Sequence, residues 1–165
     1  MTYLLDADVF IRAKNDHYSF EMVPAFWDWL DRANGNGIVH SVQRVREELL
    51  AGDDELAVWV RDRQDEFFLP ADADTVEALA TVSEWATDQD RYFQAAKATF
   101  LDSADLYLVG HALAHGDTVV THERSEPLAR ARIKIPEACQ GVGVPFASPF
   151  EMLKAENARF VLAAD

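Results

Sequence analysis

The sequence predicts a three-layer α/β/α fold, in which a mostly parallel sheet of four to five strands is flanked by helices. Short apolar runs at 3–5, 38–40, 67–69 and 118–120 alternate with longer segments that have helical spacing. Apolar runs bounded by turn residues are typical of buried strands, and strands that alternate with helices form parallel sheets through right-handed crossovers. A fifth strand is expected at 133–135.

The expected helices are placed by apolar spacing and by capping residues. Asn-Gly-Asn-Gly at 34–37 ends one helix, because these residues tolerate a positive φ angle. Ser41 is expected to cap the next helix, and Pro149 suits the first turn of the last one. The helices are expected from 9 to a break near 15–16, and at 20–33, 42–51, 53–60, 71–100 with a break near 87–88, 102–115 and from 149 onwards. No repeat or linker interrupts this pattern, so residues 1–165 are expected to form a single domain.

The charge of the chain argues against loose, sequence-independent binding to a nucleic acid backbone. Fifteen basic and 29 acidic residues give a net charge of −14. Residues 53–91 alone carry −9, so the acidity belongs largely to one segment. Residues 124–134 hold four bases and one acid. These bases are either a local track for a polyanion or scattered, solvated side chains.

Cysteine content and hydropathy indicate a cytoplasmic protein. Cys139 is the single cysteine of the chain and has no partner for an internal disulfide. The first residues lack the basic start and apolar core of a secretion signal, and no run approaches the roughly 18 apolar residues of a membrane span. We therefore expect a soluble, cytoplasmic protein with no membrane partner.

Four acids stand at comparable points of the predicted fold. Asp6 follows the first strand, Glu48 lies in the helix after the second, Asp105 is near a helix start and Glu123 follows a later strand. Ligands collect at the carboxyl ends of parallel strands, so these acids are expected to share one crevice. Carboxylates and water are the ligands that Mg²⁺ and Mn²⁺ prefer. The alternatives are ordinary: Asp102 and Asp105 suit a helix start, and Glu48 suits a solvated helix face.

Two other groups of residues have an equally ordinary interpretation. His111 and His115 are four residues apart on one predicted helix, but the glutamate of a His-Glu-x-x-His zinc site is absent. They are expected to be surface or core residues. Four tryptophans lie on predicted helix faces, where core packing is favoured over base stacking; they are Trp27, Trp29, Trp59 and Trp85.

Four segments resemble the motifs of the PIN domain superfamily, metal-dependent nucleases that include the VapC toxins of bacterial toxin-antitoxin pairs. The segments are Leu-Leu-Asp-Ala-Asp-Val-Phe-Ile at 4–11, residues 41–52 with Glu-Glu-Leu-Leu, Ala-Asp-Leu-Tyr-Leu-Val-Gly-His-Ala-Leu at 104–113, and Val-Val-Thr-His-Glu at 119–123. The resemblance implies that Asp6, Glu48, Asp105 and Glu123 hold Mg²⁺ or Mn²⁺ and catalyse hydrolysis of RNA. It also implies supporting or substrate-binding roles for Asp8, Thr121, Ser41 and Asp102.

The last motif departs from the commonest form of the family, which has aspartate at the position of Glu123. The added methylene is expected to move that carboxylate from direct metal contact towards a water-mediated role. The chain is most similar to a branch that shares Thr-His-Glu and a following Ile-Pro-Glu-Ala-Cys segment, found here at 135–139.

The resemblance implies an endoribonuclease that is the toxin of a toxin-antitoxin system. Its expected partners are RNA, an antitoxin that covers the acidic crevice, and a second copy of the chain bound through residues 20–30 and Trp59. One alternative is a non-catalytic PIN-like binding module. Another is a phosphatase similar to the haloacid dehalogenases, with Asp6 and Asp8 as nucleophile and acid. That family usually has Gly-Thr after the pair and a later lysine, whereas Val-Phe follows here and no lysine lies between 14 and 97.

Overall fold

A parallel sheet forms the middle layer of the computed structural model, which describes residues 1–164. Within that range its strands lie in the order β3-β2-β1-β4-β5, and every pairing is parallel. The strands are β1 (Tyr3–Leu5), β2 (Val39–Val42), β3 (Phe68–Leu69), β4 (Thr118–Val120) and β5 (Phe146–Ala147). The predicted parallel sheet of four to five strands is confirmed.

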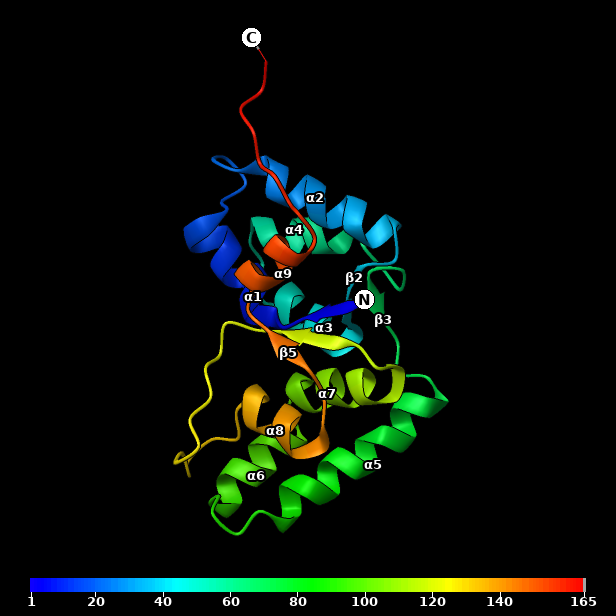
Figure 1. The fold of residues 1–165 in the computed structure, drawn as a ribbon, viewed down its shortest axis with the longest axis vertical. Helices are drawn as coiled ribbons and strands as arrows, with labels where there is room; N and C mark the ends of the chain where they lie inside the picture. Colours follow the sequence, from blue (N-terminus) through cyan, green and yellow to red (C-terminus); the bar gives the residue numbers. More distant parts are fainter. Residues whose placement is uncertain (165) are drawn as a thin grey trace.

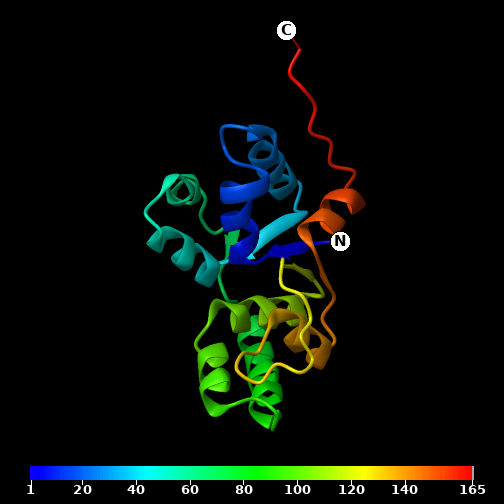
Figure 2. The same ribbon diagram turned by 90° about the vertical axis from the view of Figure 1, so that its left-hand side faces the viewer.

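Helices cover both faces of this sheet (Figure 1). They are α1 (Ala7–Arg12), continued by a π-helical turn η1 (Ala13–His17), then α2 (Pro24–Gly35), α3 (Gln43–Ala51), α4 (Glu55–Arg61), α5 (Ala73–Asp88), α6 (Gln94–Leu101), α7 (Ala104–His115), α8 (Ile135–Val142) and α9 (Pro149–Ala155). α2, α4 and α9 lie on one side of the sheet and α5 to α8 on the other, as both views show (Figures 1 and 2). α3 follows β2 and contacts both α1 and α7. The three-layer arrangement is therefore as predicted.

The central strands are buried on both faces, which explains why they read as continuous apolar runs. Leu4, Leu5 and Val119 are completely buried. Helix α2 adds Trp27, which stacks on Phe20 at 4.1 Å between ring centroids and is itself 3% exposed. The apolar face expected to join two copies of the chain is thus largely occupied by its own core.

Three local predictions are wrong. Residues 133–135 form no strand within the described chain: Ile135 begins α8, because Pro136 suits a first helical turn. The fifth strand is 146–147. Ser41 is not a cap but a residue of β2, because Ser41 and Val42 pair with Phe68 and Leu69 of β3; the helix then begins at Gln43 and not at the expected residue 42. Asp102 ends α6, and Ser103 is the N-cap of α7.

The strand order reverses between β1 and β4, which are neighbours in the sheet. Connections leave such a point in opposite directions, so a crevice opens beyond the carboxyl ends of the two strands. Leu5 pairs with Val120, and this register places Asp6 beside Thr121.

No helix within residues 1–164 is long and apolar enough to cross a membrane.

Candidate metal centre

Asp6 is held at the end of β1 by the main chain and by its neighbour. Its N–H donates to the carbonyl of Val120 at 2.9 Å, and its Oδ2 accepts from Thr121 Oγ1, also at 2.9 Å. The residue is 6% exposed. Burial raises the pKa of Asp6 well above its usual value, the negative charges of Asp8 and Asp105 raise it further, and the Thr121 hydrogen bond lowers it. Asp6 is therefore a buried acid that lacks positive charge nearby.

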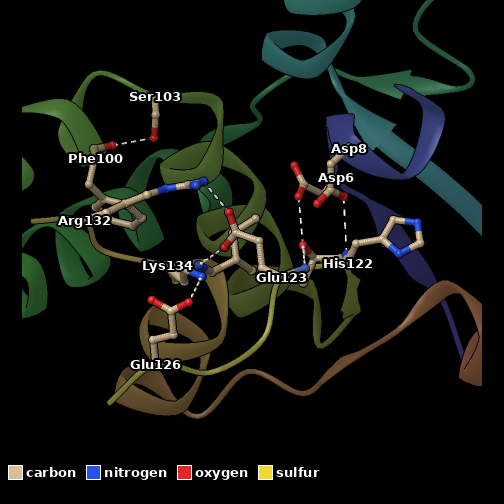
Figure 3. Close-up of polar contacts among 11 residues, drawn as sticks. Asp6, Asp8, Phe100, Ser103, His122, Glu123, Glu126, Arg132 and Lys134 are labelled. Atoms are coloured by element: carbon tan, nitrogen blue, oxygen red, sulfur yellow. Dashed lines mark hydrogen bonds and ion pairs between the residues drawn. The ribbon is translucent and has the colours of Figure 1, made fainter. Parts of the chain in front are cut away.

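Asp8 lies in the first turn of α1, two residues after Asp6, and lines the same crevice. Its Oδ1 accepts from the N–H of His122 at 3.3 Å (Figure 3), and its negative charge raises the pKa of Asp6. Ser41 supports this strand end from the other side, because its buried hydroxyl donates to the carbonyl of Leu5 at 2.6 Å. Thr121 thus contacts the central acid, Asp8 acts on it through its charge, and Ser41 positions the backbone before it.

Asp105 enters the crevice from the first turn of α7. This helix packs closely on α5, where an added methyl group on Gly110 would lie 2.7 Å from a terminal carbon of Leu79. Burial raises the pKa of Asp105 to about 7; Glu123, Glu48 and Asp8 add to the rise, and Arg132 opposes it. The same surroundings raise the pKa of the Cys139 thiol to about 12, again chiefly through burial. Asp105 is accordingly a partly buried acid among other negative charges.

Glu48 reaches the crevice from α3, the helix that follows β2. Its side chain is more exposed than that of Asp6 or Asp105. Partial burial raises its pKa, and the guanidinium of Arg44 lowers it. Arg44 is held over the ring of Tyr107 on α7, 4.7 Å from the centroid. Glu48 therefore stands at the open side of the site.

Glu123 has both carboxylate oxygens in use. Oε2 accepts from the N–H of Ile135 at 2.8 Å, and Oε1 forms an ion pair with Arg132 (Figure 3). Its own N–H donates to Thr121 Oγ1 at 3.1 Å. The side chain of Glu123 is 10% exposed and that of Arg132 is 60% exposed. Arg132 is the site residue that sequence reasoning missed, and its signal was the cluster of bases at 124–134.

The acids share one cavity of about 510 Å³. Its lining includes Asp6, Asp8, Glu48, Asp105, Glu123 and Arg132. Among residues 1–164, no three His, Cys, Asp or Glu side chains are gathered closely enough to hold a metal ion as they stand. Carboxylates without a cation repel one another and take up protons or stay apart, which agrees with the raised pKa values of Asp6 and Asp105. The donors fit a hard divalent cation in chemistry, and their assembly around it requires side-chain movement.

The remaining candidates lie outside this group. Asp102 is exposed, and its carbonyl accepts from Arg44 at 3.1 Å. His111 faces Asp117 across 3.5 Å, and His115 pairs with Asp72 at 2.9 Å. His115 is thus paired with the N-cap residue of α5, whereas the buried Nδ1 of His111 has no hydrogen-bond partner among the described residues.

Comparison with known proteins assigns the chain to a family. A family model described as "Domain of unknown function (DUF4411)" matches residues 3–160. The match covers nearly the whole chain, so the protein belongs to this family. No curated protein and no solved structure matches it.

Proposed function

We propose that this protein is a divalent-metal-dependent endoribonuclease. One observation carries the proposal: five carboxylates from β1, α1, α3, α7 and the segment after β4 line one cavity at the point where the strand order reverses. Two of them, Asp6 and Asp105, have pKa values raised by burial and by the other acids. So much unbalanced negative charge lowers stability and is explained best by a bound cation.

Asp6 and Asp105 are the proposed principal ligands, with Glu48 at the open side. Bound Mg²⁺ or Mn²⁺ would polarise the scissile phosphate and lower the pKa of water, so that hydrolysis leaves a 5′-phosphate. Thr121 favours the charged form of Asp6 by donating to Oδ2, which lowers the pKa against the effect of burial. Arg132 pairs with Glu123 and lines the cavity, where it can contact a phosphate oxygen.

The test is cleavage of a panel of structured RNAs with Mg²⁺, with Mn²⁺ and with chelator. Cleavage that requires metal is expected, and it should be lost in both Asp6→Asn and Asp105→Asn. Asp102→Asn is the matched control, since Asp102 is an exposed acid outside the cavity lining. Activity that survives both cavity substitutions contradicts the proposal.

The proposed biological role is that of a toxin neutralised by an antitoxin. The open, acidic cavity suits an arginine from a partner peptide, because a guanidinium pairs with carboxylates through two parallel hydrogen bonds. Within the chain, Arg132 already pairs with one carboxylate oxygen of Glu123 in this cavity. Copurification with the product of the adjacent gene is the expected result, and failure of the two proteins to bind contradicts this part.

A non-catalytic binding module is the second candidate, because Glu123 is already satisfied by Arg132 and by the Ile135 amide. Calorimetry separates the two: a nuclease binds Mn²⁺ at neutral pH, and a degenerate site does not. The phosphatase alternative is weaker, because none of the four lysines of the chain lines the acidic cavity. Lys14 pairs with Asp54 at 2.6 Å, and Lys97 donates to the carbonyl of Thr87 at 2.8 Å.

A further inference from the structure

A second cavity, of about 560 Å³, adjoins the acidic one. Thr121 and His122 lie on its wall, and Glu123 lines both cavities. The imidazole of His122 points away from Glu123 and Arg132 (Figure 3). The second cavity is therefore a continuation of the proposed active site beyond the end of β4, with different side chains.

Its wall carries a cluster of three aromatic rings. His17 and His122 are nearly parallel, with an angle of 15° and 6.1 Å between centroids. Phe150 meets His17 edge-on at 5.3 Å and His122 at 5.8 Å. Phe150 is 41% exposed although it is apolar. The rings come from η1, from the segment after β4 and from α9, so folding alone brings them together.

The π-helical turn that supplies His17 is unusual in itself. Such turns are rare in proteins, and those that occur are often found at functional sites. Here the turn Ala13–His17 continues α1 and ends beside the cavity. An exposed apolar ring and two histidine rings give a surface on which a flat ligand can stack.

Positive charge flanks the rings. Arg12 and Arg124 both line the cavity. Arg12 has only a long, exposed contact with Asp16, at 3.9 Å. The same wall carries two acids: Glu123 is paired with Arg132, and Glu151 caps α9, where its Oε2 accepts from the Ser148 N–H at 2.7 Å. Both acids are engaged with other groups, whereas the two arginines leave positive charge beside the rings that the acidic cavity lacks at Asp6.

We propose that this second cavity, defined by His17, His122, Phe150, Arg12 and Arg124, binds one unpaired nucleotide of the RNA next to the cleaved bond. The inference rests on the nuclease function proposed above and names a part of its substrate. The base stacks on the rings, and the two arginines contact the adjoining phosphates. Every base has a flat face, so this contact selects single-stranded RNA and not a particular sequence. A base within a duplex is stacked on its neighbours and does not enter.

The experiment measures equilibrium binding of fluorescent RNA to the full-length protein in chelator, where cleavage cannot interfere. Three probes of equal length are used: a single strand, the same strand with abasic sites, and a duplex. The single strand is expected to bind about tenfold more tightly than the abasic strand, since stacking of one base contributes that much or more. Equal binding of the two overturns the inference, because the backbone alone then accounts for it.

Two substitutions assign the effect to this cavity. Phe150→Leu keeps an apolar side chain but removes the ring, and should abolish most of the preference for the single strand over the abasic strand. Its matched control is Phe93→Leu, at another ring that is 52% exposed and lies outside both cavities. Arg124→Ala should weaken all charged probes about threefold and reduce the salt dependence by about one ion, whereas Arg61→Ala on α4 should not. Equal effects of each substitution and its control contradict the assignment.

A cleavage assay separates the failure of this inference from that of the nuclease proposal. If the protein cleaves RNA with metal but binds the single strand and the abasic strand equally, the proposed nucleotide-binding cavity is contradicted and the nuclease function is supported. If the protein binds the single strand more tightly than the abasic strand, loses this preference in Phe150→Leu and never cleaves RNA, the nuclease function is contradicted and the nucleotide-binding cavity is supported.

Discussion

The two halves of the acidic cavity are built in different ways. At the strand ends, Asp6 and Thr121 are set side by side by the register of β1 and β4, and a buried hydrogen bond joins them. Across the cavity, Asp105 stands on a helix, while Glu123 is held by Arg132 and the Ile135 amide, from a segment without regular structure and the start of α8. Main-chain pairing thus makes the first half rigid, and ionic contacts make the second half dependent on charge.

The largest effect is expected when the rigid half loses its acid. Asp6→Asn should lower RNA cleavage by about 10³-fold, because a proposed metal ligand is lost. The same change should raise the melting temperature at neutral pH, since it removes a buried charge with a strongly raised pKa. Cleavage and melting of Asp102→Asn provide the control. A fall in both quantities for Asp6→Asn would instead indicate a structural role.

Asp105 should dominate the pH dependence of stability. Its pKa is about 7 in the folded protein, against a usual value near 3.8. Between about pH 4 and pH 7 the folded protein therefore keeps a proton on Asp105 that the unfolded chain has lost. Stability therefore falls as pH rises from about 4 to 7 and stays low above that. Asp105→Asn should remove this loss and stabilise the protein at pH 8 by on the order of 2 kcal/mol, with little effect at pH 4. Urea unfolding at pH 4 and pH 8 measures the change in the free energy of unfolding. An equal gain in stability at both pH values contradicts the prediction.

Thr121 tests the hydrogen bond within the rigid half. Thr121→Val keeps the shape but removes the donor to Asp6 Oδ2. The pKa of Asp6 should rise further, because that bond lowers it, and Mn²⁺ affinity should fall about tenfold. Thr87→Val, at an exposed threonine of α5, should leave Mn²⁺ affinity unchanged. Calorimetry at pH 7 compares the two, and equal affinities would show that Thr121 only satisfies the backbone.

Arg132 tests the charge-dependent half, with the smallest expected effect. Arg132→Ala removes a positive charge that repels a bound cation; because it also raises the pKa of Asp105, Mn²⁺ affinity is measured well above pH 7, where Asp105 has lost its proton. Mn²⁺ affinity should rise about threefold, because the arginine is exposed and its field is screened. Arg61→Ala removes an equal charge from a surface pair with Asp53 and should change nothing. A lower affinity in Arg132→Ala would mean that the arginine holds Glu123 in position for the metal.

Most of the rigid half follows from local patterns. The apolar runs before Asp6 and Thr121 predict strands, and the order of elements predicts that the strand ends meet. The position of β5 does not follow in this way. It is a two-residue strand with Phe146 exposed at 37%, so it lacks the buried run that marks the others. Ile133 and Ile135 have that apolar character but lie outside any strand, since an irregular segment and the start of a helix can be buried as well.

The sequence by itself determined the parallel sheet, the helices on both faces and the acids that follow its strands, because periodicity and chain order are local properties. Only the tertiary structure decided the partners: Arg132 beside Glu123, and the rings of His17, His122 and Phe150 together in one cavity. Those contacts join residues from separate elements, and their geometry depends on how the whole chain packs. The spacing of residues along the chain therefore does not predict these contacts.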